Sequence, residues 1–297
     1  MRSFGWLLRK AYESWSDDNG PRLAAALAYY TLFSLAPLLM IAMSIAGAAL
    51  GERPVETGLV AQFYGLVGSA GAAAIENLLR DLHKPGVTTV SGVSGSILLL
   101  IGASAVFVEL EDALNTIWHA QKMRGSLRTM AVEWLRGFSL VMIGEIFLIV
   151  SVSLATVRAT LDRIAAAQWP GIELSLHFLG ILASFVTATI LFGMLFKLLP
   201  NTPIAWRDVW PAAMVTAVMF NAGKLLIALY LGNSSIITAY GAASSLVAFV
   251  GWVYYSALIL YFGAEFAKVY ARAYGSLVQF DLSSGESFHA RVASLRR

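Results

Sequence analysis

The chain of 297 residues contains no cysteine, and only 13% of its residues are charged. The missing thiols exclude disulfide frameworks, thiol nucleophiles and cysteine-ligated zinc, although they do not identify the compartment. The charged fraction is about half of the roughly 25% that is typical of soluble domains. This composition excludes an ordinary soluble enzyme.

Common catalytic motifs are also missing. The sequence contains no HExxH pair, no Walker A loop and no GxSxG elbow. The histidines fall on different segments, without the spacing of metal ligands: His83, His119, His177 and His289. We therefore expect no catalytic residue, no bound metal, no cofactor and no ATPase activity, so the protein is classified as a non-enzyme.

Hydrophobic residues make up 58% of the chain and gather in long runs. One crossing of a bilayer takes about 20 apolar residues. Six stretches meet this requirement: 23–50, about 90–108, 135–157, 174–199, 210–231 and 242–266. The sequence therefore predicts an all-α, polytopic membrane protein with six transmembrane helices.

The flanking segments divide the chain into three parts. We expect a cytoplasmic amphipathic head at 1–21, a single six-helix transmembrane domain at 22–267 and a basic cytoplasmic tail at 268–297. The head is too long and too charged for a cleavable signal peptide. Its apolar residues recur at helical spacing: Phe4, Leu7, Leu8, Ala11 and Trp15. This helix is predicted to lie on the inner membrane surface, with its aromatic face in the headgroups, and to end at Asn19-Gly20-Pro21.

Two connections outside the membrane leave alternatives open. The first, at about 51–88, is too charged to cross, and its apolar residues keep the i, i+3/i+4 rhythm of amphipathic helices. It either rests on the bundle or the membrane, or forms a lid over a cavity. The second is an uncharged outer connector that contains Tyr240 and Gly241. It either dips back toward the bundle or makes a tight turn.

The basic residues predict the orientation. Most of the 21 Lys and Arg residues fall on one side of the six crossings, and both termini lie on that same side. By the positive-inside rule this side is cytoplasmic. Because orientation accounts for the basic residues, nucleic acid is not expected as a partner.

Two ionisable residues are predicted to lie deep in the bilayer. Glu145 lies about 16 Å along the third crossing and Lys224 about 21 Å along the fifth, with Asn221 one turn below it. An ionisable group at such a depth costs about 2.5–3.5 kcal/mol and is a functional candidate. We expect Glu145 and Lys224 to meet inside the bundle, with a hydrogen bond from Asn221. The pair either fixes helix register or lines a pathway in which Glu145 exchanges a proton; Lys224 snorkelling outward is the third alternative.

The first crossing contains a candidate hinge and cavity formed by Tyr29, Tyr30, Ser34 and Pro37. Pro37 removes the hydrogen-bond donor of the Phe33 carbonyl, which predicts a kink. Membrane helices tolerate proline, so ordinary packing is the alternative to a hinge beside a binding cavity.

Charges gather at the predicted inner boundary of the membrane. They form a candidate inner gate: Glu109, Glu111, Asp112, Arg136, Lys197 and Glu265. Opposite charges at one depth favour ion pairs, and such pairs either close a pathway or have no special role.

Several stretches together resemble the YihY/BrkB family, formerly labelled ribonuclease BN. They are AAALAYYTLFSLAPLL at 24–39, LEDALNTIW at 110–118, LLPNTPIAWRDVWPAA at 198–213, FNAGKLLIALYL from 220, and YGAASSLVAFVGWVYYSALILYFGAEF at 240–266. A departure occurs at Pro211-Ala212-Ala213, where relatives commonly have a Gly-Ala pair. The positions that match the family pattern, with roles unassigned, are Tyr29, Tyr30, Pro37, Asn115, Pro200, Lys224, Tyr240, Gly241 and Glu265.

The resemblance implies a multi-pass protein of the bacterial cytoplasmic (inner) membrane, in a family whose members are linked to virulence-related envelope resistance and to movement of lipids or solutes. We expect a transporter or translocator of a lipid or small solute without its own ATPase. The alternatives are a non-transporting envelope-integrity scaffold and, third, an RNA-processing nuclease. The expected partners are membrane lipids and a substrate of unknown identity, and a homo-oligomer stays open.

Overall fold

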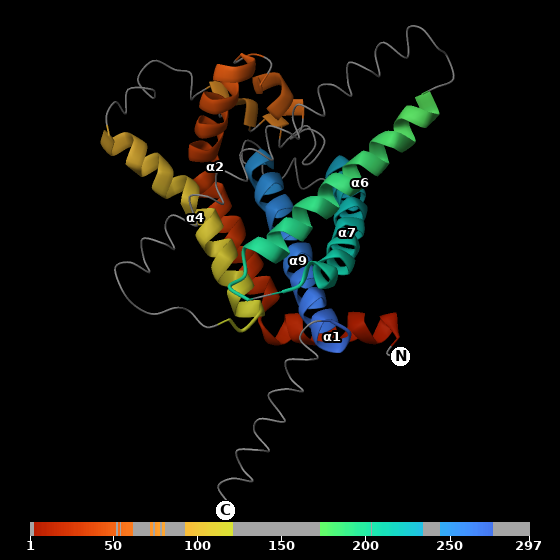
Figure 1. The fold of residues 1–297 in the computed structure, drawn as a ribbon. Helices are drawn as coiled ribbons and strands as arrows, with labels where there is room; N and C mark the ends of the chain where they lie inside the picture. Colours follow the sequence, from red (N-terminus) through yellow and green to blue (C-terminus); the bar gives the residue numbers. More distant parts are fainter. Residues whose placement is uncertain are drawn as a thin grey trace, which may run out of the picture.

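The structure is a computed structural model whose described part consists of long helices (Figure 1). It describes residues 3–51, 53, 55–61, 72–73, 75–77, 79–80, 93–120, 173–202, 204–233 and 244–275. The helices in this part are α1 (Phe4–Asp17), α2 (Gly20–Leu50), α4 (Val93–Ile117), α6 (Glu173–Leu198), α7 (Trp206–Asn233) and α9 (Ser244–Ala273). No strand occurs among these residues, which confirms the all-α prediction for them.

Helix α9 is the centre of the described bundle. It contacts α1, α2, α4, α6 and α7. Helices α2 and α4 pack as one pair and α6 and α7 as another, on either side of α9 (Figure 1). Helix α1 lies across the end of the bundle where α9 ends (Figure 1).

Close packing around α9 depends on small residues. A Cβ atom on Gly263 would collide with the hydroxyl of Thr216 on α7 and lie 3.0 Å from the ring of Phe196 on α6. Only glycine lets these helices approach so closely, which is typical of helix contacts in membranes. The surrounding core is apolar and includes Tyr261 and Phe266 of α9.

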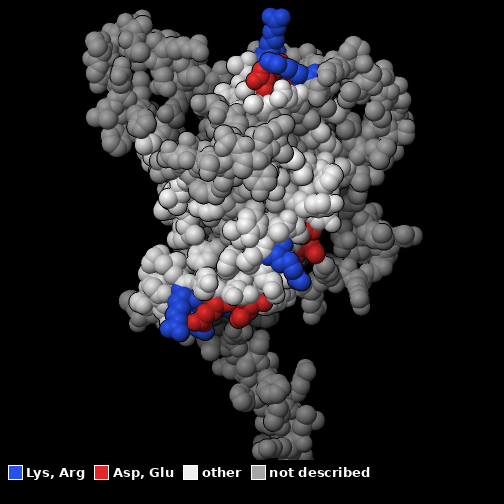
Figure 2. All heavy atoms as spheres, turned by 180° about the vertical axis from the view of Figure 1, so that it is seen from behind, with Lys and Arg blue, Asp and Glu red and all other residues white. Residues whose placement is uncertain are grey.

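Large apolar side chains also cover the outside of the described helices. Exposed examples are Phe33, Ile181, Leu182, Val186, Trp210, Met214, Val218 and Leu226. On the face drawn in Figure 2, the charged side chains of the described residues gather toward the two ends, and the described residues between them are uncharged. An apolar surface of this extent faces lipid or a partner rather than water. The arrangement is that of a membrane protein.

Five of the six predicted crossings coincide with long helices: α2, α4, α6, α7 and α9. The stretch 135–157 lies outside the described residues. By length and apolarity alone, three described segments can span a membrane: Gly20–Ile41, Gly180–Leu198 and Leu246–Ala273. The number of crossings and their orientation stay predictions.

Helices α4 and α9 extend well beyond the predicted crossings at their C-terminal ends. Helix α4 continues to Ile117 because Leu110, Ala113, Leu114 and Ile117 form a buried stripe at helical spacing. Helix α9 continues to Ala273, so Lys268 lies within a helix rather than in the tail that was expected to begin there.

The head forms the predicted helix, and the break falls at the predicted place. Asn19 adopts φ 55°, a left-handed conformation that asparagine tolerates, and Pro21 stands in the first turn of α2. Leu7 and Ala11 are buried in the core, and the Phe4 ring lies 6.0 Å from that of Phe266. This face of α1 therefore packs on protein, although the head was expected to lie along the membrane surface.

The described residues of the outer connection pack on the bundle. Val55, Leu59, Ile75 and Leu79 are buried in one cluster with Leu39 of α2 and with Ala248, Phe249 and Trp252 of α9. Arg80 and Glu76 form an ion pair on the opposite, more exposed side. These contacts favour the interpretation in which the segment rests on the bundle, and they do not test the lid.

Candidate functional site

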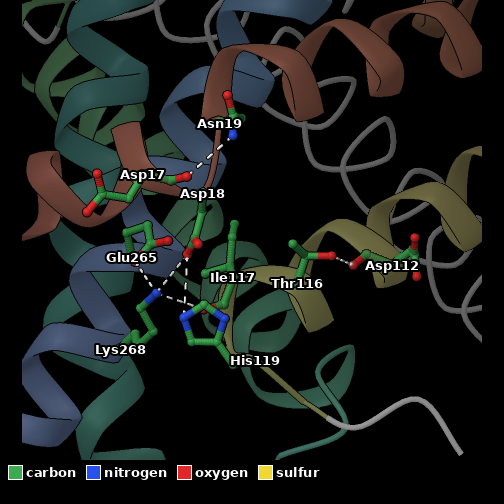
Figure 3. Close-up of polar contacts among 9 residues, drawn as sticks. All are labelled: Asp17, Asp18, Asn19, Asp112, Thr116, Ile117, His119, Glu265 and Lys268. Carbon is green, nitrogen blue, oxygen red and sulfur yellow. Dashed lines mark hydrogen bonds and ion pairs between the residues drawn. The ribbon is translucent and has the colours of Figure 1, made fainter.

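Charged side chains from three parts of the chain meet at the C-terminal end of α9, the end that the sequence places at the inner membrane boundary (Figure 3). The ammonium Nζ of Lys268 lies 2.7 Å from the Glu265 carboxylate and 3.0 Å from that of Asp18. It also donates to the backbone carbonyl of Ile117 over 2.8 Å. The imidazole of His119 lies 3.9 Å from Asp18. We call Asp18, His119, Glu265 and Lys268 the inner charge cluster.

Local structure brings these groups together. Glu265 and Lys268 are three residues apart on α9 and so share a helix face. The Ile117 carbonyl belongs to the last turn of α4, where it has no intrahelical donor. The break between α1 and α2 aims Asp18 into the cluster, while the carboxylate of Asp17 points away from it (Figure 3).

The cluster is unusual for its burial. Glu265 is 0% exposed and Lys268 only 1% exposed. Burial by itself raises the pKa of Asp18, but Glu265 and the Lys268 ammonium more than offset this and hold that pKa below its ordinary value of 3.8. Asp18 is therefore ionised at neutral pH and joins the α1–α2 junction to α9.

A half-open cavity of about 330 Å³ adjoins the cluster between α1 and α9. Lys268 and Ser14 lie in its wall, together with Lys10, Glu13, Asp17 and Arg272. Lys10 is already paired with Glu13 at 2.7 Å. The cavity therefore brings water close to charges that are otherwise enclosed.

Among the described residues, three of the predicted inner-gate side chains have different partners. Glu265 belongs to the inner charge cluster, whereas Glu111 accepts a hydrogen bond from Asn201 over 3.3 Å. Lys197 donates to the Ile204 carbonyl of its own α6–α7 connection. Glu109 and Asp112 are half-buried on α4, and Arg136 lies outside the described residues.

A second link ties α4 to the α6–α7 connection. The Asn115 side chain is buried and accepts a hydrogen bond from the backbone N–H of Asn201 over 2.7 Å. Together with the Glu111 contact, it anchors this connection to the end of α4.

A polar group lies deep in the α6–α7 pair. Lys224 is half-buried, donates to the Ser184 hydroxyl over 3.2 Å and stands 5.5 Å from the centre of the Phe220 ring. Asn221 lies 3.5 Å from the same hydroxyl and donates to the Ala217 carbonyl. Asn221 and Lys224 therefore both contact the hydroxyl of Ser184. Glu145 lies outside the described residues, so its pairing with Lys224 stays a prediction.

The candidate hinge residues separate into two environments. Ser34 is buried and donates to the Gly102 carbonyl of α4 over 2.6 Å, and a Cβ on Gly102 would lie 3.0 Å from the Pro37 ring. Tyr29 and Tyr30 are 60% and 39% exposed. Ser34 and Pro37 therefore form a tight α2–α4 contact, while the two tyrosines lie at the surface. Tyr240 and Gly241 lie outside the described residues.

Sequence reasoning missed several residues of these sites. Lys268 was assigned to the tail, and its spacing of three from Glu265 was the signal that could have placed it beside that residue. Ser184 and Gly102 gave no signal, because small residues are common throughout membrane helices. Asp18 is one of several charged residues that precede the first crossing, and nothing in the sequence distinguishes it from the others.

Comparison with known proteins supports the resemblance. A family model described as virulence factor BrkB matches residues 11–282. A UPF0761 membrane protein of Ralstonia nicotianae is 27% identical over 267 residues, which cover 88% of this chain and 58% of that protein. A second, from Pseudomonas paraeruginosa, is 30% identical over 83% of this chain and 58% of its own length. A third, from Pseudoalteromonas translucida, is 27% identical over 84% of this chain and 80% of its own length.

The chain spans 58% of the Ralstonia relative and 54% to 61% of two others, so these relatives are considerably longer. No solved structure matches the chain.

Proposed function

Because the chain belongs to the virulence factor BrkB family, whose relatives are membrane proteins, we propose that it is a transporter or translocator of a lipid or small solute. In this proposal it crosses the bacterial cytoplasmic membrane six times, with both termini inside. It has no ATPase and performs no catalytic step, and it works among membrane lipids without nucleic acid.

The observation that carries the proposal is the placement of Lys224. Lys224 lies 18 residues along α7 from Trp206, which is about 27 Å at 1.5 Å per residue. Within the described residues it contacts a hydroxyl and an aromatic ring rather than a carboxylate. In this proposal Lys224 offers its positive charge to a passing anionic or polar group, and intramembrane ionisable residues commonly mark such pathways.

The inner end supports the same proposal in a different way. A pathway past Lys224 needs an inner closure, and the inner charge cluster joins α1, α4 and α9 at that end. Ion pairs that hold packed helices together can separate and re-form between two arrangements of a bundle.

Reconstitution into liposomes tests the proposal. The expected result is protein-dependent lipid scrambling or solute flux that falls at least about tenfold in Lys224→Met, because the intramembrane cation is lost. Lys224→Arg, which keeps the charge, should retain more activity. Leu226→Ala is the matched control, since Leu226 is 62% exposed on the same helix.

The alternatives give different outcomes. Equal lipid and solute movement with and without the native protein would favour the envelope-integrity scaffold. RNA cleavage by the purified protein, lost on substitution of an acidic cluster, would favour the nuclease. Flux that is unchanged in Lys224→Met would remove this residue from the mechanism.

A further inference from the structure

The inner charge cluster contains one more carboxyl group than its buried cation can balance. Asp18 and Glu265 both face Lys268, which is the one ammonium that pairs with either of them among the described residues. His119 is largely exposed and carries charge only when protonated. With both carboxyl groups ionised, the buried part would have a net negative charge.

No other charged group in the described residues supplies the balance. The remaining titratable side chains of the elements at this end form no ion pair with Asp18, Glu265 or Lys268: Lys10, Glu13, Asp17, Arg22, Glu109, Lys197, Arg207, Asp208, Tyr261 and Arg272. A fully buried carboxylate without its own partner is strongly unfavourable. The simplest way to remove the excess charge is to bind a proton.

We propose that Asp18 and Glu265 form a proton-binding site that holds one proton between them, and that this proton keeps α1 and the α1–α2 junction docked on α9. With one proton bound, one carboxylate and one ammonium remain, and the cluster is neutral. Both carboxyl oxygens of Glu265 are buried, and Oε2 lies 2.7 Å from the Lys268 ammonium, so Oε1 is the oxygen that can carry this proton.

The cavity between α1 and α9 gives the proton a route. It is half-open, and both Ser14 and Lys268 lie in its wall. Protons therefore exchange with the aqueous side on which α1 lies, without crossing the apolar part of the bundle.

Two changes of protonation undo the docking. Loss of the shared proton leaves a net negative charge in a buried site, and water enters to solvate it. A second proton, bound at low pH, leaves Lys268 without a carboxylate. The docked state is thus favoured over an intermediate range of pH, and the alkaline limit belongs to the shared proton.

Site-specific thiol labelling tests this proposal, since the chain has no cysteine of its own. A single cysteine at Ala11, which is 0% exposed, reports undocking of α1. A cysteine at Tyr12, which is 60% exposed, gives the labelling rate of a solvent-exposed thiol on the same helix. The ratio of the two rates cancels the intrinsic pH dependence of the thiol.

We expect this ratio to rise about tenfold or more between about pH 7 and about pH 9, because an uncompensated charge appears in the buried cluster. Glu265→Gln replaces the protonated carboxyl by a neutral amide, so the rise should disappear. Glu76→Gln is the control: it removes an acid of the outer connection that pairs with Arg80 outside the cluster and the cavity, and the rise should stay.

A ratio that does not change with pH in the parent, or an equal rise in Glu265→Gln and the parent, would overturn the proposal. If Glu265→Gln does not accumulate, Asp18→Asn is tested by the same ratio of labelling rates. It also leaves one carboxylate for Lys268, so the rise with pH should disappear in this variant too. Labelling reports docking of α1 without any transported substrate. Its outcome therefore stands apart from the flux experiments of the proposed function.

Discussion

The ammonium of Lys268 lies 3.0 Å from the carboxylate of Asp18, although 250 positions separate the two residues in the chain. This contact joins the break between α1 and α2 to the C-terminal end of α9. Because Lys268 is buried, its charge needs a carboxylate partner when the helices pack at that end.

Removing the cation should therefore destabilise the protein. We expect Lys268→Met to reduce the free energy of unfolding by about 3–5 kcal/mol, since two carboxyl groups lose their buried partner. Thermal unfolding in detergent measures the change. Lys10→Met is the control, because Lys10 forms only an exposed pair with Glu13 and should change stability little. Similar midpoints for the two variants would contradict the role of the buried contact.

The lowered pKa of Asp18 makes docking of α1 sensitive to acid. A carboxyl group with a lowered folded-state pKa stabilises the folded protein above its ordinary value of 3.8, and this contribution is lost as the pH falls through the lower folded value. Stability should therefore decline below about pH 4. In Asp18→Asn the decline should be smaller, as measured by unfolding midpoints across acidic pH; an identical decline would place the sensitive group elsewhere.

Two glycines of α9 should respond oppositely to alanine. Gly263→Ala brings a methyl group into the space of Thr216 and should lower stability by about 1–3 kcal/mol. Gly251→Ala meets nothing within 4 Å and should leave stability unchanged or raise it by up to about 1 kcal/mol through better helix propensity. Thermal unfolding of both variants checks the pair, and an equal effect would mean that α7 does not approach α9 as closely as described.

The predicted pairing of Glu145 with Lys224 calls for a double-mutant cycle. Contacting residues couple by about 0.5–3 kcal/mol, so Glu145→Gln and Lys224→Met should together destabilise less than the sum of the single changes. Unfolding in detergent measures the four variants. Additive effects would leave Ser184 and Phe220 as the contacts of Lys224, as in the described residues.

The sequence alone was sufficient to predict the long helices of the described residues. In lipid a backbone must satisfy its own hydrogen bonds, so long uncharged runs such as 23–50 leave little choice but a helix. The break after α1 could also be predicted from the local sequence, because Asn19, Gly20 and Pro21 each disfavour continuation of a helix. The predicted crossings in α4 and α9 end before the helices themselves do. Both helices continue beyond the apolar run, because stripes of buried residues extend them.

Partners across the bundle depended on the tertiary structure. Hydropathy places Glu265 and Lys197 at one depth, but which group each contacts depends on how its helix is rotated and on where the neighbouring connection lies. That rotation put Lys268 between two carboxyl groups, Lys197 on a backbone carbonyl and Ser184 beside Lys224. Apolar runs determine that helices form, because the backbone hydrogen bonds of a helix all lie within one segment. Contacts between helices depend on how the side chains of several segments pack together, so no single segment encodes them.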